Sequence, residues 1–107
     1  MKQQPLLLTQ NLTVPCQQGI HMRAASQIVT LANRFRADVW FSSQSRSANA
    51  KSILSMLELG AVAEEKLVLT AKGADAADAV KAMTELFNSQ NALCGLSPHT
   101  DPPLKRS

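Results

Sequence analysis

His21 stands where an amphipathic helix is expected to begin, and Arg23 follows two residues later. The first turn of a helix leaves about four backbone N–H groups unpaired and carries roughly half a positive charge. An anion attached to this histidine would be received by those groups. Imidazole is nucleophilic when neutral, and its ordinary pKa of about 6.5 leaves most of it neutral at neutral pH. His21 is therefore a candidate phosphoryl acceptor, because a phosphorylated ring nitrogen stays reactive enough to pass its group onward.

Arg23 offers a planar fork of N–H donors that suits phosphate oxygens, and it keeps its charge at neutral pH. With the helix start it would stabilise the charge on a transferred group, which is where phosphoryl transfer draws most of its catalysis. On spacing alone, a plainer interpretation stays open for both residues. A single histidine near a helix start is commonly a cap or a surface residue, and a single arginine is commonly solvated.

The pattern of apolar residues predicts the elements that position these side chains. Alternation over residues 6–14 predicts a strand that Pro15 ends, and spacings of three and four after Met22 predict a helix of about four turns. Ser52 and Asp75 suit helix N-caps, and Gly60 suits a helix end. The predicted elements are a strand at 6–14, a helix from 22 with core residues Ala25, Ile28, Val29, Ala32 and Phe35, a strand at 39–41, a turn at 42–44, a polar edge strand at 45–50, a helix at 53–59, a strand at 67–70, and a helix with core residues Ala76, Ala79, Val80, Met83, Leu86 and Phe87.

The order of these elements is strand, helix, strand, strand, helix, strand, helix. It is typical of an α+β domain in which helices cover one face of an antiparallel sheet. We assign residues 1–90 to this domain. Residues 91–107 are rich in proline and polar residues, which predicts a flexible tail or a linker to another module.

Composition narrows the functional classes. At 107 residues the chain has the size of one domain. Its net charge is +3, but its basic residues form no stripe and do not alternate with aromatic residues. We therefore expect no nucleic-acid partner. The chain has no apolar run of about 18 residues and no signal peptide, so we expect a cytoplasmic protein without membrane insertion. Cys16 and Cys94 lack metal-ligand spacing, and we expect two reduced thiols, no metal and no cofactor.

Two segments of the chain together resemble the signatures of one family. The first is Gly19-Ile20-His21-Met22-Arg23-Ala24-Ala25-Ser26, and the second, about thirty residues further on, is Ser45-Arg46 followed by Lys51-Ser52-Ile53-Leu54-Ser55-Met56-Leu57-Glu58-Leu59-Gly60. In this order they resemble the HPr family, the small phosphocarrier proteins of the bacterial phosphotransferase system and its nitrogen-related branch. The resemblance covers roughly residues 6–88. Met22 departs from the pattern, because the family usually has alanine, serine or threonine there, and this concerns the choice of partner more than the chemistry.

The resemblance implies a two-layer open-faced sandwich, with a four-stranded antiparallel sheet in the order 1-4-2-3 and three helices on one face. It implies that Nδ1 of His21 accepts phosphate from a phosphoenolpyruvate-dependent enzyme I, beside Arg23, and that an enzyme IIA-type protein receives it, as in sugar transport. The chain would then be a carrier rather than an enzyme, without a cofactor, and a monomer. Alternatively, it would be the HPr-like domain of a multiphosphoryl transfer protein.

Ser52 has two open interpretations. It is explained by helix capping alone. In some HPr proteins, however, the matching serine is phosphorylated by an ATP-dependent kinase, and the added charge alters docking.

The helix at 53–59 is too short to bury all of its apolar side chains against one sheet. We therefore expect Ile53 and Leu54 to be exposed and to form, with Met22, a small surface for transient docking. A hypothesis of another class remains, in which the chain is a regulatory docking module of this fold that no longer relays phosphate.

Overall fold

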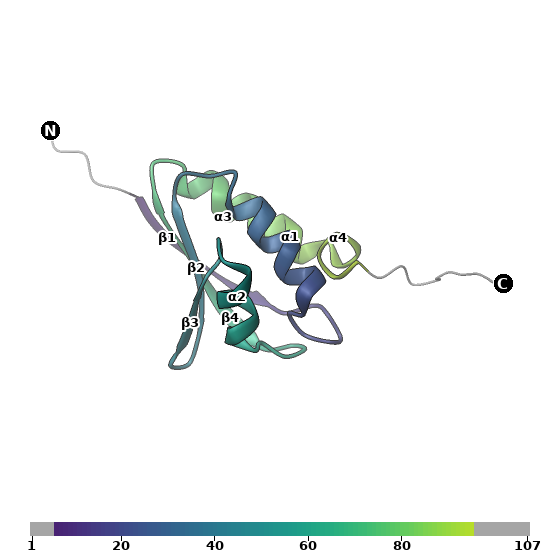
Figure 1. The fold of residues 1–107 in the computed structure, drawn as a ribbon. Coiled ribbons are helices and arrows are strands. Elements are labelled where there is room, and N and C mark those ends of the chain that lie inside the picture. The colour runs from purple at the N-terminus through teal and green to yellow at the C-terminus, as the bar shows by residue number, and fades with distance from the viewer. Residues whose placement is uncertain (1–5, 96–107) are drawn as a thin grey trace, which may run out of the picture.

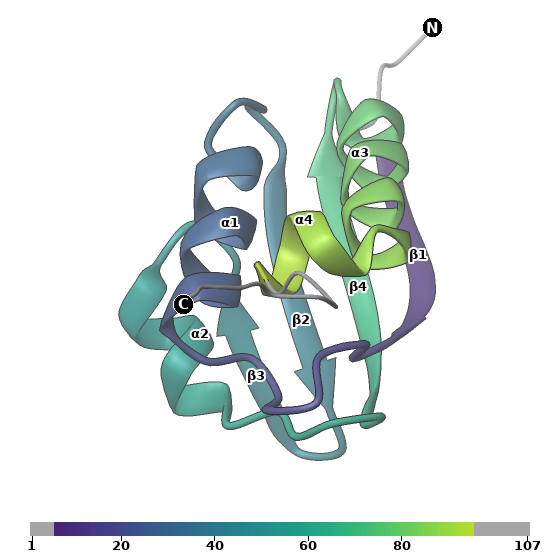
Figure 2. The ribbon, with the colours of Figure 1, turned by 90° about the vertical axis from the view of Figure 1, so that its right-hand side faces the viewer.

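A computed structural model of the chain describes residues 6–95, in which a layer of helices covers a sheet (Figure 1). The elements are β1 (Leu6–Thr13), α1 (Met22–Ala32), β2 (Asp38–Ser43), β3 (Arg46–Asn49), α2 (Ile53–Leu59), β4 (Lys66–Gly73), α3 (Ala76–Asn88) and α4 (Gln90–Cys94). The strands form one antiparallel sheet in the order β1-β4-β2-β3. The helices lie on one face of it, as the perpendicular view in Figure 2 also shows.

The predicted α+β class and the strand order 1-4-2-3 are confirmed. The number of helices in residues 6–95 is four rather than three, because α4 occupies residues where the sequence predicted the start of a flexible tail. Five residues are too few for a periodic pattern to reveal a helix. No helix within residues 6–95 combines the length and hydrophobicity that crossing a bilayer needs.

The core lies between the sheet and the helices. On the first strand and just after it, Leu12 and Val14 are buried while Asn11 and Thr13 are exposed, as the alternation predicts. The helices contribute the buried residues Ala24, Ala25, Ile28 and Ala32 from α1 and Ala76, Ala79, Met83 and Phe87 from α3. These positions recur every three or four residues, so each helix turns one apolar face toward the sheet.

Three predicted boundaries were wrong. α1 ends at Ala32, so Phe35 lies beyond the helix although it still packs partly buried against the core. β2 continues to Ser43 and β3 begins at Arg46, so the turn lies at 44–45 rather than at 42–44. β4 spans Lys66–Gly73 rather than residues 67–70, because it pairs along its length with β1 and with β2.

Asp75 precedes α3 but does not cap it with its side chain. The carboxylate instead accepts hydrogen bonds from the backbone N–H groups of Arg36 at 2.9 Å and Ala37 at 2.8 Å. These bonds, the one from Arg36 foremost, hold the pKa of Asp75 below its ordinary value. Asp75 was expected to cap α3, but its side chain instead fixes the connection between α1 and β2 to the start of α3.

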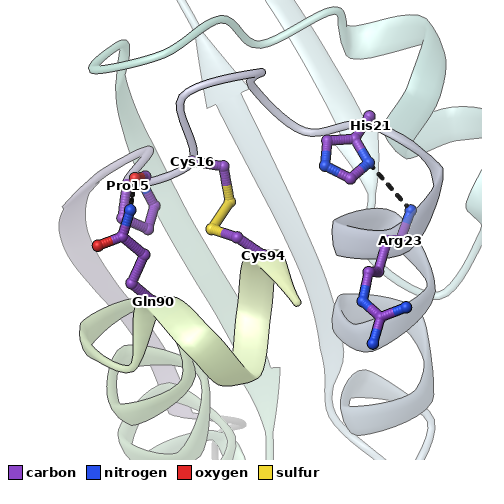
Figure 3. Close-up of a disulfide and its surroundings, with 6 residues drawn as sticks. All are labelled: Pro15, Cys16, His21, Arg23, Gln90 and Cys94. Atoms are coloured by element: carbon purple, nitrogen blue, oxygen red, sulfur yellow. Dashed lines mark hydrogen bonds between the residues drawn. A yellow bond between two sulfur atoms is a disulfide. The ribbon is translucent and has the colours of Figure 1, made fainter. Parts of the chain in front are cut away.

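A disulfide joins Cys16 to Cys94, with a Cα–Cα distance of 5.5 Å (Figure 3). The expectation of two reduced thiols is therefore wrong for this structure. Both cysteines are buried, and the bond connects the loop between β1 and α1 to the last residue of α4. The two residues are 78 positions apart, and only the folded arrangement brings α4 beside that loop.

Candidate functional site

His21 is the N-cap residue of α1, and its ring is turned toward the helix start. The ring nitrogen Nδ1 accepts a hydrogen bond from the backbone N–H of Arg23 at 3.3 Å (Figure 3). The residue is half-buried. Among the described residues, the N–H groups of Met22 and Ala24 have no backbone acceptor. A group attached to Nδ1 would therefore lie beside three amide donors at the positive end of a helix.

The loop that carries His21 is held against the connection between α2 and β4. The N–H of Ile20 donates to the carbonyl of Ala61 at 3.0 Å, and the N–H of His21 donates to that of Gly19 at 3.1 Å. Gly19 has a φ of +75°, and a Cβ on it would lie 2.4 Å from the carbonyl oxygen of Ala61. Glycine is therefore required here for both conformation and space, and it fixes the approach of the chain to His21.

The guanidinium of Arg23 does not lie beside the imidazole. In Figure 3 its side chain points away from the ring. It covers Gly95, the residue after α4, so closely that a Cβ on Gly95 would lie 1.5 Å from Nε of Arg23. Arg23 is exposed, and its guanidinium must leave Gly95 before its charge can reach Nδ1. That Arg23 binds the phosphoryl group stays a prediction.

Three apolar side chains of α1 and α2 face solvent. The exposed fractions are 57% for Met22, 37% for Ile53 and 66% for Leu54. They come from α1 and α2, which pack against each other, whereas Met56 and Leu59 of α2 are buried. The structure thus leaves exposed the residues expected to form a docking surface. Their role in docking stays a prediction.

Ser52 caps α2, as the capping interpretation predicts. Its Oγ accepts a hydrogen bond from the backbone N–H of Ser55 at 3.1 Å. At the other end of α2, Gly60 has a φ of +66°, the left-handed conformation in which helices commonly end. Because Ser52 is partly exposed, a kinase could still reach it, and its phosphorylation stays a prediction.

A cluster of polar side chains fixes the end of α2 to the sheet. Glu65 accepts hydrogen bonds from the Ser43 hydroxyl and from the N–H of Val62, and it forms an ion pair with Arg46. Arg46 also donates to the carbonyl of Leu59. The bond from Ser43, then that from Val62, and the charge of Arg46 hold the pKa of Glu65 below its ordinary value. Arg46 belongs to the second motif, and these contacts give it a structural role.

Sequence reasoning missed two residues next to the site, Cys94 and Gly95. Nothing in the sequence links Cys94 to the histidine loop, since its only partner is 78 residues away. A glycine after a short helix signals a helix end, but it does not reveal that an arginine from another helix lies over it. Both omissions concern long-range contacts, which periodicity and local motifs do not encode.

Comparison with known proteins bears on the site as a whole. The family described as the PTS HPr component phosphorylation site matches residues 8–89. The phosphocarrier protein HPr of Neisseria meningitidis serogroup A is 32% identical over 82 residues, which cover 77% of this chain and 92% of that protein. The family match thus includes both motifs and every element from β1, without its first two residues, to α3.

Solved structures share the fold. HPr-C-His from Thermoanaerobacter tengcongensis has a TM-score of 0.75 and 29% identity, covering 78% of this chain and 93% of that one. A structure described as an HPr dimer from the same organism has a TM-score of 0.63 and 33% identity, covering 67% of this chain and 83% of that one. With a family match over most of its length and this common fold, the chain belongs to the HPr family.

Proposed function

We propose that this protein is a phosphocarrier of a phosphotransferase system. His21 accepts a phosphoryl group on Nδ1 from a phosphoenolpyruvate-dependent enzyme I and gives it to an enzyme IIA-type protein. The observation that carries the proposal is the position of Nδ1, which lies 3.3 Å from the N–H of Arg23 at the start of α1. A phosphoryl group bound there would be stabilised by first-turn amides and by the helix dipole.

The transfer step needs little from this chain beyond a nucleophile and an anion site. Nδ1 forms a bond to phosphorus as the bond from phosphorus to the donor breaks, and the phosphoramidate formed remains reactive. Arg23 supplies further positive charge once its side chain turns toward the phosphoryl oxygens. In this proposal the chain is a carrier with no cofactor of its own.

Further features of the proposal concern partners and setting. Met22, Ile53 and Leu54 form the docking surface, and their modest area suits a complex that must dissociate quickly.

We propose a cytoplasmic protein that acts as a monomer. A similar chain has been crystallised as an HPr dimer, so size-exclusion chromatography with light scattering decides the oligomeric state. Whether residues 96–107 are a tail or lead into another module is decided by sequencing the remainder of the reading frame.

The test of the phosphocarrier proposal is phosphorylation at one histidine. The chain contains two histidines, His21 and His99, so His99→Ala is a matched control for His21→Ala. Purified protein incubated with enzyme I and labelled phosphoenolpyruvate should gain an acid-labile, base-stable phosphate. His99→Ala should retain it and His21→Ala should lose it. Labelling that survives in His21→Ala, or no labelling with several enzymes I, would contradict the proposal.

The alternative, a regulatory docking module that relays no phosphate, makes the opposite prediction in cells. Under that hypothesis His21→Ala preserves the cellular function, whereas Ile53→Asp removes it. Under the phosphocarrier proposal both variants lose function. The hydrogen bond to Nδ1 is also one that a helix cap makes, so the two variants decide between the hypotheses.

A further inference from the structure

One covalent bond links the histidine loop to the residue on which Arg23 lies. Cys16 is five residues before His21 in the sequence, and its disulfide partner Cys94 is the last residue of α4. Gly95 follows directly, with a φ of +71° and its N–H donating to the carbonyl of Asn91 at 2.9 Å. The disulfide therefore fixes where Gly95 stands relative to the start of α1.

Arg23 occupies the space that any other residue at position 95 would fill. A Cβ on Gly95 would lie 1.5 Å from Nε, 2.2 Å from Cδ and 2.6 Å from Cζ of Arg23. The guanidinium also lies near the C-terminal end of α4, where helix carbonyls carry a partial negative charge that favours a cation. Arg23 thus has a resting place that is separate from the imidazole (Figure 3).

We propose that the Cys16–Cys94 disulfide is a redox switch that acts on Arg23 through Gly95. This proposal rests on the phosphocarrier function given above. While the bond is intact, Gly95 is held under Arg23 and keeps the guanidinium away from His21. When the bond is reduced, Gly95 moves and Arg23 turns toward Nδ1, where it assists phosphoryl transfer.

In this proposal, reduction displaces the end of α4 because the two sulfurs move apart. A dithiol reductant supplies two electrons and two protons, its own sulfurs become a disulfide, and Cys16 and Cys94 become two thiols. Sulfurs that are no longer bonded separate to van der Waals contact. Cys16 and Cys94 are each 1% exposed, so both sulfurs are enclosed by packed neighbours that must shift when the sulfurs separate. Leu93 anchors α4 in the core, so the movement falls on the end that carries Gly95.

The proposed location of the protein fits a switch better than a permanent bond. In a reducing cytoplasm, disulfides are usually transient and serve catalysis or redox sensing. Two cysteines placed on either side of a phosphorylation site would then report the thiol state of the cell through the rate of phosphoryl transfer.

The experiment compares oxidised protein, dithiol-reduced protein and the Cys16→Ser/Cys94→Ser variant, with circular dichroism confirming that each is folded. Phosphoramidate serves as the phosphoryl donor, because its phosphorus–nitrogen bond breaks, ammonia leaves and no partner protein is needed. Phosphorus NMR follows phosphohistidine. We expect formation to be about threefold to tenfold faster in the reduced protein and in the double variant. Equal rates in all three would overturn the switch.

Arg23→Ala tests whether the effect passes through the arginine. In that variant, reduction should leave the rate unchanged, since the group that the disulfide restrains is gone. A redox effect that persists in full without Arg23 would mean that the disulfide acts by another route, and the proposal would be wrong.

Two glycine variants test the contact in the oxidised protein. Gly95→Ala places a methyl group where Arg23 lies, so it should raise the rate as reduction does. Gly60→Ala is the matched control, because Gly60 has a similar φ of +66° but a Cβ there meets nothing closer than 3.8 Å. It should leave the rate unchanged. If Gly95→Ala behaved like Gly60→Ala, the contact with Arg23 would have no role in the switch.

A measurement without phosphate separates this proposal from the one it rests on. Nitrogen NMR relaxation of the Nε–Hε group should show that Arg23 becomes more mobile on reduction. If His21 accepts no phosphate in any form, the phosphocarrier function fails. If His21 is phosphorylated but neither rate nor Arg23 mobility responds to reduction, only the switch fails.

Discussion

Gly19 lies against Ala61 so closely that a Cβ on Gly19 would stand 2.4 Å from the carbonyl oxygen of Ala61. Gly19→Ala should therefore lower the free energy of unfolding by about 2–4 kcal/mol, from the left-handed backbone and from the steric clash. Denaturant unfolding measures this loss. Gly60→Ala has the backbone cost alone and should lose about 1 kcal/mol. Equal losses in the two variants would show that the contact with Ala61 is not restrictive.

In the reduced protein, Arg23→Ala should slow phosphoryl transfer by about tenfold, because a charge-assisted contact with the phosphoryl oxygens is lost. Arg23→Lys retains the charge but not the planar fork, so its rate should fall between those of the alanine variant and the wild type. Single-turnover transfer from phosphorylated enzyme I measures both. The side chain is exposed, so thermal unfolding should change little. A wild-type rate in Arg23→Ala would remove this residue from the site.

Ser52→Ala should lower the free energy of unfolding by about 1 kcal/mol, because the N–H of Ser55 loses its acceptor. Ser52→Thr keeps the hydroxyl and should lose less. Chemical denaturation distinguishes the two. If Ser52→Ala were as stable as the wild type, the cap would contribute nothing.

Ser52→Asp tests regulation, since an acidic side chain at a helix start maintains the cap and adds charge. Under the kinase hypothesis this variant stays stable but is phosphorylated more slowly by enzyme I. With phosphoramidate as donor its rate should equal that of the wild type. An unchanged rate with enzyme I would leave Ser52 with capping alone.

Leu54→Asp should raise the KM of enzyme I for this protein several-fold while kcat changes little, because a charge then interrupts the apolar docking surface. Leu7→Asp is the matched control. Leu7 is similarly exposed, at 59% against 66% for Leu54, but it lies on β1, away from the site. Initial-rate kinetics over a range of carrier concentrations separates KM from kcat. Similar kinetics for the two variants would exclude a role of Leu54 in docking.

The stability of the protein should fall in acid partly through Glu65. Its pKa is lower in the folded chain than in the unfolded chain, chiefly because Ser43 donates a hydrogen bond to it. The contribution is therefore complete above the unfolded pKa of about 4.3 and is lost as the pH falls through the folded pKa. In Glu65→Gln, the free energy of unfolding should depend less on pH between about pH 6 and pH 3. An identical pH dependence would contradict this assignment.

Much of this fold could be predicted because its signals are local. Alternation in β1 and three-to-four spacing in α1 and α3 each mark one buried face. Ser52 and Gly60 mark the ends of α2 by hydrogen bonding and backbone conformation, which depend on near neighbours. His21 could be identified because the unpaired N–H groups of the first turn of a helix lie beside the residue that precedes the helix. The strand order came from the family resemblance, since local pattern gives no pairing.

The remaining features depend on contacts between distant segments. Asp75 is of a residue type that often caps helices, but its carboxylate accepts hydrogen bonds from the N–H groups of Arg36 and Ala37 instead. Arg23 has the spacing of a phosphate ligand, but its resting place is set by Gly95 on another element. The bond from Cys16 to Cys94 brings those elements together. Such partners become visible only once the chain is folded.

The disulfide also gives the chain a closed topology. It forms a covalent ring that encloses every described element except β1, which precedes Cys16 and pairs with β4 at the edge of the sheet. In the chain-entropy model, a ring of this size stabilises the native state by on the order of 4 kcal/mol. β1 lies outside the ring and is held by its pairing with β4 and by Leu12 in the core. In the oxidised chain, exchange of this strand with that of a second copy would therefore need no segment to thread through the ring.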